Sequence, residues 1–299
     1  MMLTLDQVTK TYRTGTLGGG SFTAVDRVSF AAGKGEVVSL IGESGSGKST
    51  IGRMVLGLTP VSSGALTLDG RPVRGGREYY RRVQGVFQDP FSCYNPVFKA
   101  DRVFAMIRHA YHPRVPAGEW AARVERAVRD VRLDPGAVLG KYPHQLSGGQ
   151  LQRLLIARAL LLDLTFLVAD EITSMLDAST RIDVLNLLAD LKERGLGVLY
   201  ITHDLSLGTY LAERTVVLRR GRVVERGDTQ RVFGNPRHPY TRTLLASVPR
   251  LGAPWTEADP VTECAFHAAG GGGAGALRET EPDHFVACAQ LPDCGRNAA

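Results

Sequence analysis

Short, mostly apolar runs separated by polar turns recur along this chain and predict buried strands. Three of them, residues 37–41, 166–169 and 198–201, are too short for a helix and do not alternate between apolar and polar positions. Such runs are typical of strands that are covered on both faces, as in a parallel sheet. Because apolar positions at helical spacing lie between them, the pattern predicts an α/β fold.

Apolar residues fall on one face of several predicted helices. These faces comprise Ile51, Met54, Val55 and Leu58; Val124, Ala127, Val128 and Val131; Leu151, Leu154, Leu155 and Leu162; and Ile182, Leu185, Leu188 and Leu191. The last of these helices should stop at Gly195. Hairpins are predicted at Asp69-Gly70 and around Gly221, because these turn residues separate strand-like runs.

The same pattern divides the chain into regions. Residues 3–85 are rich in predicted strands, residues about 89–163 form a helical subdomain, and strands alternate with helices again over 164–230. We expect residues 1–250 to form the main domain of the chain. The C-terminal extension, residues 251–299, contains a glycine-rich linker and is predicted to be partly flexible.

A glycine-rich segment after the first buried strand matches the phosphate-loop pattern of nucleotide-binding proteins. It reads Gly42-Glu43-Ser44-Gly45-Ser46-Gly47-Lys48-Ser49-Thr50. Its place between a strand and a helix lets backbone amides cradle phosphates, whereas a simple linker would not carry a lysine and a hydroxyl at this offset. We expect Lys48 to reach the β- and γ-phosphates of a nucleotide and the Ser49 hydroxyl to ligate Mg²⁺.

Polar side chains also follow the other predicted strands. Asp170 and Glu171 end the run 166–169, where Asp170 can hold Mg²⁺ and Glu171 can polarise the water that attacks the γ-phosphate. His203 stands at the exit of the run 198–201, a place suited to a γ-phosphate contact. Gln88 follows another strand-like run and could contact Mg²⁺ or the attacking water.

Ser147-Gly148-Gly149-Gln150 forms a second candidate phosphate-binding surface. Its glycines let backbone amides approach a phosphate closely, and the predicted helix that follows points its positive end at the same place. One chain with two such surfaces suggests that two subunits clamp ATP between them.

Taken in order, these motifs resemble those of the ATP-binding subunits of ABC transporters, from about residue 3 to residue 250. The resemblance implies a P-loop ATPase of the ABC type, with a RecA-like core, a β-rich subdomain and a helical subdomain, that binds ATP and Mg²⁺ and hydrolyses ATP. It implies that Tyr12 stacks on adenine and that Gln88 couples the site to membrane partners. It also implies that the segment 147–150, the signature, binds the ATP of the opposite subunit, that Asp177 contacts the partner, and that His203 is the switch histidine.

A narrower resemblance is to the peptide/nickel branch of importer ATPases. The segments that carry it are Gln88-Asp89-Pro90-Phe91-Ser92-Cys93-Tyr94-Asn95-Pro96, Asn235-Pro236-Arg237-His238-Pro239-Tyr240-Thr241-Arg242 and Leu244-Leu245-Ala246-Ser247-Val248-Pro249. They imply an importer for peptides or related solutes, with nickel or opine-like chelates as other cargoes. By themselves they suggest a surface segment that packs on the core.

The resemblance also implies partners and a location. These are a second ABC ATPase subunit in a homodimer or heterodimer, two transmembrane permease subunits and, indirectly, an extracytoplasmic solute-binding protein. The protein would lie peripherally on the cytoplasmic face of the inner membrane. The chain has no signal-peptide core and no apolar stretch long enough for a membrane span.

Two departures from the family pattern stand out. Ile172 replaces the proline that usually follows the catalytic glutamate. Near the C-terminus the branch often carries four cysteines able to hold an iron–sulfur cluster, whereas this chain has Cys264, Cys288 and Cys294, with Gly270 in place of the fourth. We therefore expect unpaired reduced thiols and no cluster.

The net charge of +6 does not by itself indicate a nucleic-acid partner, because the arginines are scattered. Two other classes share the nucleotide motifs. A DNA-handling ATPase usually has a long coiled coil or zinc insertion, and neither lies between Thr50 and Leu146. A non-transport ATPase, such as a phosphonate-metabolism or assembly component, stays open at this point.

Overall fold

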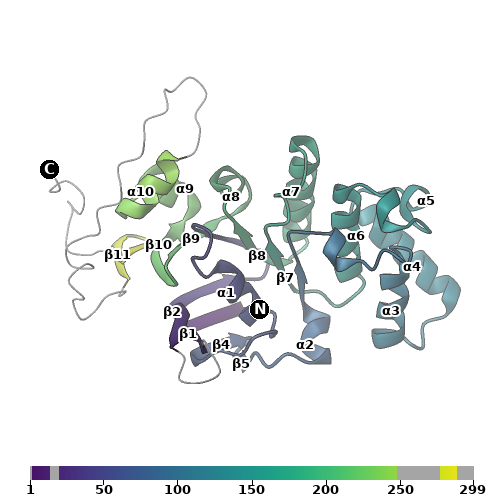
Figure 1. Cartoon of the computed structure of the whole chain (residues 1–299), viewed down its shortest axis with the longest axis horizontal. Helices are drawn as coiled ribbons and strands as arrows, with labels where there is room; N and C mark the ends of the chain where they lie inside the picture. Colours follow the sequence, from purple (N-terminus) through teal and green to yellow (C-terminus); the bar gives the residue numbers. More distant parts are fainter. Residues whose placement is uncertain (1, 14–19, 248–276, 288–299) are drawn as a thin grey trace.

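The computed structural model describes residues 2–13, 20–247 and 277–287, which form two β-sheets with helices between and around them (Figure 1). The smaller sheet is antiparallel, and its strand order among the described residues is β2-β1-β4-β5. Its strands are β1 (Met2–Arg13), β2 (Ser21–Gly33), β4 (Ser63–Leu68) and β5 (Arg71–Pro72). This sheet is the β-rich subdomain that the resemblance implied.

The larger sheet contains the strands that the apolar runs predicted. Across the described ranges its order is β11-β12-β10-β9-β3-β8-β7-β6. Its strands are β3 (Val37–Ile41), β6 (Val83–Val86), β7 (Phe166–Asp170), β8 (Gly197–Thr202), β9 (Arg214–Arg219), β10 (Arg222–Asp228), β11 (Arg278–Glu281) and β12 (His284–Val286). Strands β6, β7, β8, β3 and β9 run parallel. Their C-terminal ends therefore meet at one edge of the sheet, where α/β proteins bind ligands.

Helix α1 (Lys48–Val55) lies between the two sheets, touching β7 and β8 on one side and β2 on the other. Ile51, Met54 and Val55 are fully buried there, as predicted. The prediction for Leu58 is wrong. The helix ends at Val55 and Gly57 takes a φ of 66°, so the chain turns away and leaves Leu58 58% exposed.

Four helices cover the opposite face of the larger sheet. They are α7 (Ala178–Glu193), α8 (Leu205–Leu211), α9 (Thr229–Gly234) and α10 (Pro239–Ala246). Leu185, Leu188 and Leu191 of α7 are buried as predicted, and the chain turns at Gly195. Ile182 was predicted to join them but is 43% exposed, because it lies outside the apolar cluster that buries the later turns.

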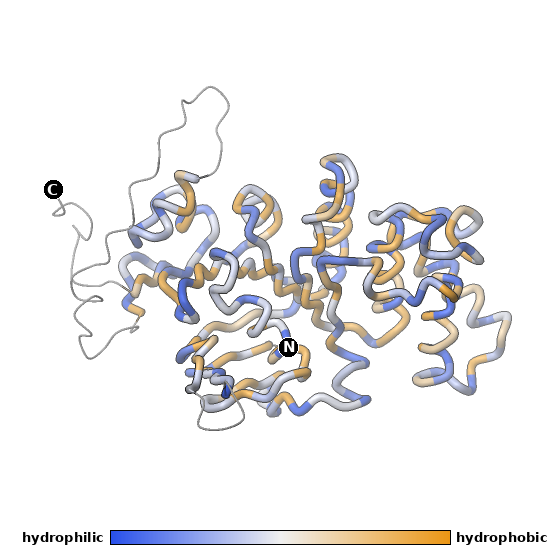
Figure 2. Tube along the Cα trace, viewed as in Figure 1, coloured by the Kyte–Doolittle hydropathy of each residue, from blue (hydrophilic) through white to orange (hydrophobic). Residues whose placement is uncertain are grey.

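The helical subdomain stands at one end of the molecule, at the right of Figure 1. It comprises α3 (Arg102–Tyr111), α4 (Ala117–Asp130), α5 (Pro135–Val138) and α6 (Gly148–Leu160), and α2 (Arg77–Arg82) precedes it. The predicted apolar face of α4 is buried, and Leu162 is buried just beyond the end of α6. Figure 2 shows the hydrophobic residues concentrated along the central strands and the inner faces of these helices.

Both predicted hairpins are present, and their turns explain the glycines. Asp69 and Gly70 have φ of 52° and 72°, and Arg220 and Gly221 have φ of 46° and 81°. Two successive positive φ values give the turn whose twist matches that of paired strands. The turns thus connect β4 to β5 and β9 to β10.

A further hairpin, β11–β12, joins the larger sheet where the sequence pattern gave no sign of strands. Strand β12 pairs with β10, with Glu225 opposite Val286 and Gly227 opposite His284. Three predicted features, the glycine-rich linker, the cysteines at 264, 288 and 294, and Gly270, lie outside the described residues. None of the helices in the described ranges is long and apolar enough to cross a membrane.

Candidate functional site

The phosphate loop leaves the C-terminal end of β3 and turns sharply into α1. Gly42, Gly45 and Gly47 have φ of 150°, 78° and 107°, values that favour glycine. A Cβ on Gly42 would lie 2.1 Å from the Leu218 carbonyl oxygen, and one on Gly47 would lie 2.5 Å from the Ala24 carbonyl oxygen. The glycines are therefore required both by the turn and by the close approach of neighbouring strands.

Lys48 begins α1 and folds its side chain back over the loop. Its Nζ donates to the carbonyl oxygens of Gly42 and Glu43 at 2.7 Å each and lies 3.4 Å from Ser46 Oγ. Burial lowers the pKa of Lys48, while the carboxylates of Glu171 and Asp170 oppose that shift. The cation is thus held at the mouth of the loop by acceptors that phosphate oxygens can replace.

Two of the three residues predicted to hold Mg²⁺, Ser49 and Asp170, lie side by side at the sheet edge. Ser49 Oγ donates to Asp170 Oδ1 at 3.5 Å. Burial raises the pKa of Asp170, which makes an isolated carboxylate there costly and a cation favourable. A hydroxyl and a carboxylate are oxygen donors of the kind that Mg²⁺ prefers, so these residues fit that ion.

Glu171 and His203 meet at the ends of β7 and β8. His203 Nδ1 lies 3.2 Å from Glu171 Oε1. The Glu171 amide donates to the Ile201 carbonyl oxygen at 2.9 Å, and its φ of 51° turns the side chain out of the strand direction. A left-handed conformation costs a non-glycine residue about 1–2 kcal/mol. The fold therefore holds this carboxylate in a set position beside the phosphate loop.

The segment after Glu171 keeps a regular turn although Ile172 replaces proline. The Ser174 amide and hydroxyl both donate to the Glu171 carbonyl oxygen, at 3.1 Å and 2.9 Å. Ile172 is buried in the core beside this turn. Hydrogen bonds and packing thus hold this turn without a proline.

The signature residues cap helix α6. Ser147 Oγ accepts from the Gln150 amide at 3.2 Å, and Gln150 Oε1 accepts from the Ser147 amide at 2.8 Å. This capping box uses two of the amides at the helix start, which leaves those of Gly148 and Gly149 for an external acceptor. The arrangement suits a phosphate that arrives from outside the subunit.

Asp177 lies close to the signature, at the start of α7. Its carboxylate accepts from the Thr180 amide at 3.0 Å and from the Ser179 hydroxyl at 2.6 Å, which hold its pKa below the usual range. A Cβ on Gly149 would lie 2.2 Å from Thr180 Cγ2, so the two helix starts touch. Ser147 and Asp177, which are both exposed, therefore lie close together, and Gly149 is buried where the two helix starts meet.

The site residues thus fall into two groups. Lys48, Ser49, Asp170, Glu171 and His203 gather around the phosphate loop. Among the described residues, no hydrogen bond or ion pair joins the signature to that loop. Two further predicted residues are exposed: Gln88, after β6, and Tyr12, which is 36% exposed near the end of β1 with Lys10 Nζ 5.1 Å from its ring centre.

Comparisons with known proteins bear on this arrangement. The ABC transporter family model matches residues 25–174, and the model described as the oligopeptide/dipeptide transporter C-terminal region matches residues 224–270. The oligopeptide transport ATP-binding protein AmiF of Streptococcus pneumoniae is 41% identical over 239 residues, 78% of this chain and 77% of AmiF. The chain belongs to the ABC transporter family. A putative peptide import ATP-binding protein of Brucella ovis is 39% identical over 289 residues, 88% of this chain and 90% of that protein.

Solved ABC structures agree with the fold. A dimeric ATP-binding cassette in a post-hydrolysis state, bound to ADP and Pi, has a TM-score of 0.67 and 29% identity, over 76% of this chain and 98% of that one. The protein cbiO1 of Clostridium perfringens, part of an ABC transporter complex, has a TM-score of 0.67 and 25% identity, over 84% of this chain and 96% of that one. The predicted ABC ATPase fold is confirmed, and the chain is an ABC ATPase.

Sequence reasoning missed how this ABC ATPase ties the signature helix to the Gln88 segment. Gln152 of α6 is fully buried and donates from Nε2 to the Phe87 carbonyl oxygen at 3.1 Å. Arg158 donates to the Gly85 carbonyl oxygen at 3.1 Å. The only sign of this contact in the sequence was the polar side chain of Gln152, next to the apolar positions of the predicted helix. These hydrogen bonds join α6 to the strand and turn that precede Gln88.

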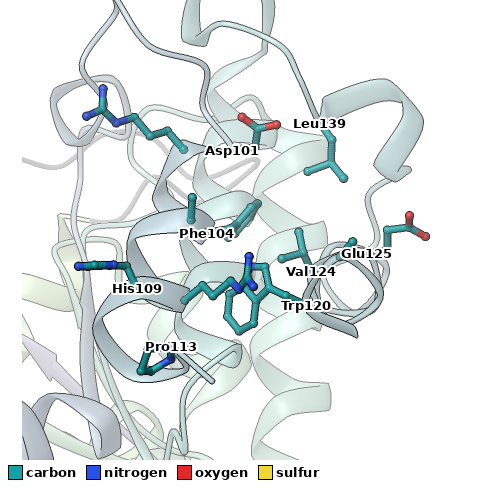
Figure 3. A pocket seen from close by; sticks show the side chains of 12 residues that line it. Asp101, Phe104, His109, Pro113, Trp120, Val124, Glu125 and Leu139 are labelled. Carbon is teal, nitrogen blue, oxygen red and sulfur yellow. The ribbon is translucent and has the colours of Figure 1, made fainter. Parts of the chain in front are cut away.

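An open cavity of 530 Å³ lies in the helical subdomain, away from the phosphate loop (Figure 3). Phe104, Trp120 and Val124 give it an apolar wall, and Asp101 and Glu125 lie near its rim. No residue of the phosphate loop or signature lines it. This cavity is therefore separate from the nucleotide motifs of this ABC ATPase.

Proposed function

We propose that this chain hydrolyses ATP in sites shared by two ATPase subunits and thereby drives a peptide importer. The main support is the separation of the two groups of site residues. One group surrounds the phosphate loop. The other, the signature, offers backbone amides at the start of α6, and no hydrogen bond among the described residues joins it to that loop. In a head-to-tail pair, the signature of one subunit would face the phosphate loop of the other. The second subunit can be this chain or a related ATPase.

Each residue near the loop has a distinct role in this proposal. Lys48 would exchange its backbone acceptors for the β- and γ-phosphate oxygens of ATP. Glu171 would orient the attacking water and take up its proton, with His203 beside it holding the γ-phosphate. Mg²⁺ held by Ser49, Asp170 and Gln88 would neutralise charge on the phosphates. Tyr12 would stack on adenine.

Peptide import is supported by the relatives and by the C-terminal region. The names of the relatives specify oligopeptide transport and peptide import, and the matched C-terminal region is that of oligopeptide/dipeptide transporters. In this proposal, two permease subunits from other chains form the membrane-spanning part of the transporter. The chain would bind them at the cytoplasmic face, and an extracytoplasmic binding protein would deliver the peptide.

Purification from membranes tests the partners and the cargo together. We expect the full-length chain to co-purify with two permease subunits and an ATPase partner. Reconstituted with ATP inside liposomes and the binding protein outside, the complex should take up labelled peptides. The same complex with Glu171→Gln should bind ATP without uptake, which controls for leakage. Efficient uptake of nickel or opine-like chelates, without uptake of peptides, would contradict the peptide assignment alone.

A further inference from the structure

In the sequence, the segment 235–242 indicated the branch of the family but suggested no chemical role. In the structure it leads into helix α10, whose Tyr240 is 1% exposed. Tyr240 packs in an apolar cluster with Leu205, Val217 and Ile41. Ile41 is the last residue before the phosphate loop, so this tyrosine lies against the base of that loop.

The hydroxyl of Tyr240 reaches the phosphate loop itself. It accepts a hydrogen bond from the Glu43 amide at 3.0 Å. The carbonyl of the same peptide unit, that of Gly42, accepts from Lys48 Nζ at 2.7 Å. The peptide between Gly42 and Glu43 is therefore held on one side by the lysine and on the other by Tyr240.

Tyr240 is suited to be a fixed acceptor. Burial raises the pKa of its phenol, so the group stays neutral. The Arg219 guanidinium lies 5.1 Å from the ring centre, which adds a cation–π contact across the helix start. A ring that is buried and packed in this way leaves the hydroxyl little freedom to leave Glu43.

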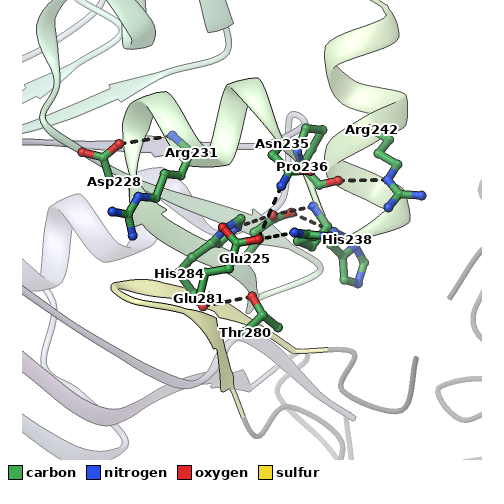
Figure 4. Close-up of polar contacts among 11 residues, drawn as sticks. Glu225, Asp228, Arg231, Asn235, Pro236, His238, Arg242, Thr280, Glu281 and His284 are labelled. Carbon is green, nitrogen blue, oxygen red and sulfur yellow. Dashed lines mark hydrogen bonds and ion pairs between the residues drawn. The ribbon is translucent and has the colours of Figure 1, made fainter. Parts of the chain in front are cut away.

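The start of helix α10 is anchored by polar contacts of Glu225, His238 and His284 (Figure 4). The buried carboxylate of Glu225 accepts from the amides of Arg237 and His238 at 2.7 Å and 2.9 Å. His284 Nε2, from the C-terminal hairpin, lies 2.7 Å from the same carboxylate. His238 Nδ1 in turn accepts from the Tyr240 amide at 3.1 Å, which caps the helix.

We propose that Tyr240 is a positioning residue for the ATP site. Its hydrogen bond fixes the first turn of the phosphate loop and, through the Gly42 carbonyl, the position of Lys48 before ATP arrives. The C-terminal region thereby raises ATP affinity by preorganising the loop. This inference rests on the proposed assignment of the phosphate loop to ATP.

Tyr240→Phe in the full-length chain tests this role, because it removes only the hydroxyl. Loss of one such hydrogen bond should weaken Mg²⁺-ATP binding about three- to tenfold. In the assembled transporter the KM for ATP should rise by a similar factor with kcat close to wild type, since Tyr240 contacts neither Glu171 nor His203. That split is expected for lost ground-state binding.

Thr243→Val is the matched control in the same helix. Its hydroxyl donates to the Pro239 carbonyl oxygen at 3.2 Å, within α10 and away from the loop. This variant should keep wild-type ATP affinity. An equal loss of affinity in both variants, or unchanged affinity in Tyr240→Phe, would overturn the proposal. A lower melting temperature with unchanged affinity would show that Tyr240 is only a packing residue.

Hydrogen exchange gives an independent measurement. In the nucleotide-free wild type the Glu43 amide should be protected, and Tyr240→Phe should remove that protection. Rapid exchange of this amide in the wild type would contradict the proposal even if the variant failed to fold.

Lys48→Ala distinguishes the role of Tyr240 from the assignment of the phosphate loop to ATP, on which that role rests. Wild-type ATP binding in Lys48→Ala would refute the loop assignment, whereas a binding defect there combined with unchanged Tyr240→Phe would refute only the role of Tyr240.

Discussion

The phosphate-loop group and the signature surface differ in how far one chain completes them. Around the loop, Lys48 and Ser49 come from α1 and Asp170 comes from β7. Lys48 donates to carbonyl oxygens of the loop, and Ser49 donates to Asp170. At the signature, the side chains of Ser147 and Gln150 cap the start of α6, and Asp177 caps its own helix. The residues of the first group are therefore already assembled around the loop, whereas the signature is a capped helix start without a ligand-binding partner from the same chain among the described residues.

The physical reason lies in where each group is placed. The loop and the acidic pair share the edge of one parallel sheet, so strand pairing fixes their distances. The signature lies at the start of α6, which packs with the helical subdomain. In the proposed head-to-tail pair, a second subunit would bring its signature to this loop.

Lys48→Ala should have the largest effect, because it removes the cation of the group assembled around the loop. We expect ATP hydrolysis to fall by about 10²–10³-fold, since charge on the β- and γ-phosphates is no longer neutralised. Steady-state ATPase rates of the assembled complex measure this. Lys34→Ala is the control, because Lys34 is exposed in a turn far from the loop. Near-normal hydrolysis in a folded Lys48→Ala protein would contradict the assignment of this group.

Glu171→Gln should separate binding from chemistry. The amide keeps the size of the side chain but cannot take up the proton of water, so hydrolysis should fall by about 10²–10⁴-fold while ATP still binds. Sizing with Mg²⁺-ATP, with the partner ATPase present if one is required, should show a trapped dimer. A monomeric variant that hydrolyses ATP at the wild-type rate would rule out this role for Glu171.

Ser147→Arg should affect the other surface alone. A bulky cation at the signature should prevent the dimer from closing, while the chain's own phosphate loop still binds ATP. Sizing and ATP titration on the same sample measure the two effects. Ser147→Ala controls for the lost helix cap, whose removal costs about 1 kcal/mol. If Ser147→Arg forms the ATP dimer as well as Ser147→Ala does, the signature does not lie at the subunit boundary.

Gly149→Ala should have the smallest effect and tests the link between the signature and Asp177. Its Cβ would meet Thr180 Cγ2 at 2.2 Å, whereas a Cβ on Gly148 would find its nearest neighbour at 3.7 Å. We expect a loss of unfolding free energy of about 1–3 kcal/mol for Gly149→Ala, measured by denaturant unfolding. Gly148→Ala should lose less. Adding Thr180→Ser, which removes the clashing methyl group, should recover part of the loss; no recovery would place the strain elsewhere.

The local sequence predicted those parts of the site whose functional groups and backbone turn lie in one short segment. The phosphate loop needs glycines, a lysine and a hydroxyl in one run between a strand and a helix, so its identity could be read from residues 42–50. The errors at Leu58 and Ile182 have the opposite origin. Both fit a helical repeat, but helix ends and the packing of neighbouring elements decide which turns are covered.

The sequence by itself determined the ABC ATPase fold, the nucleotide motifs and their order, because these depend on residue type and spacing along the chain. Only the tertiary structure decided that the hairpin β11–β12 extends the larger sheet, that His284 meets the buried Glu225, and that Tyr240 holds the Glu43 amide. Glu43 and Tyr240 are 197 residues apart in sequence. Hydrogen bonds over such separations leave no local pattern, because they depend on how whole layers pack.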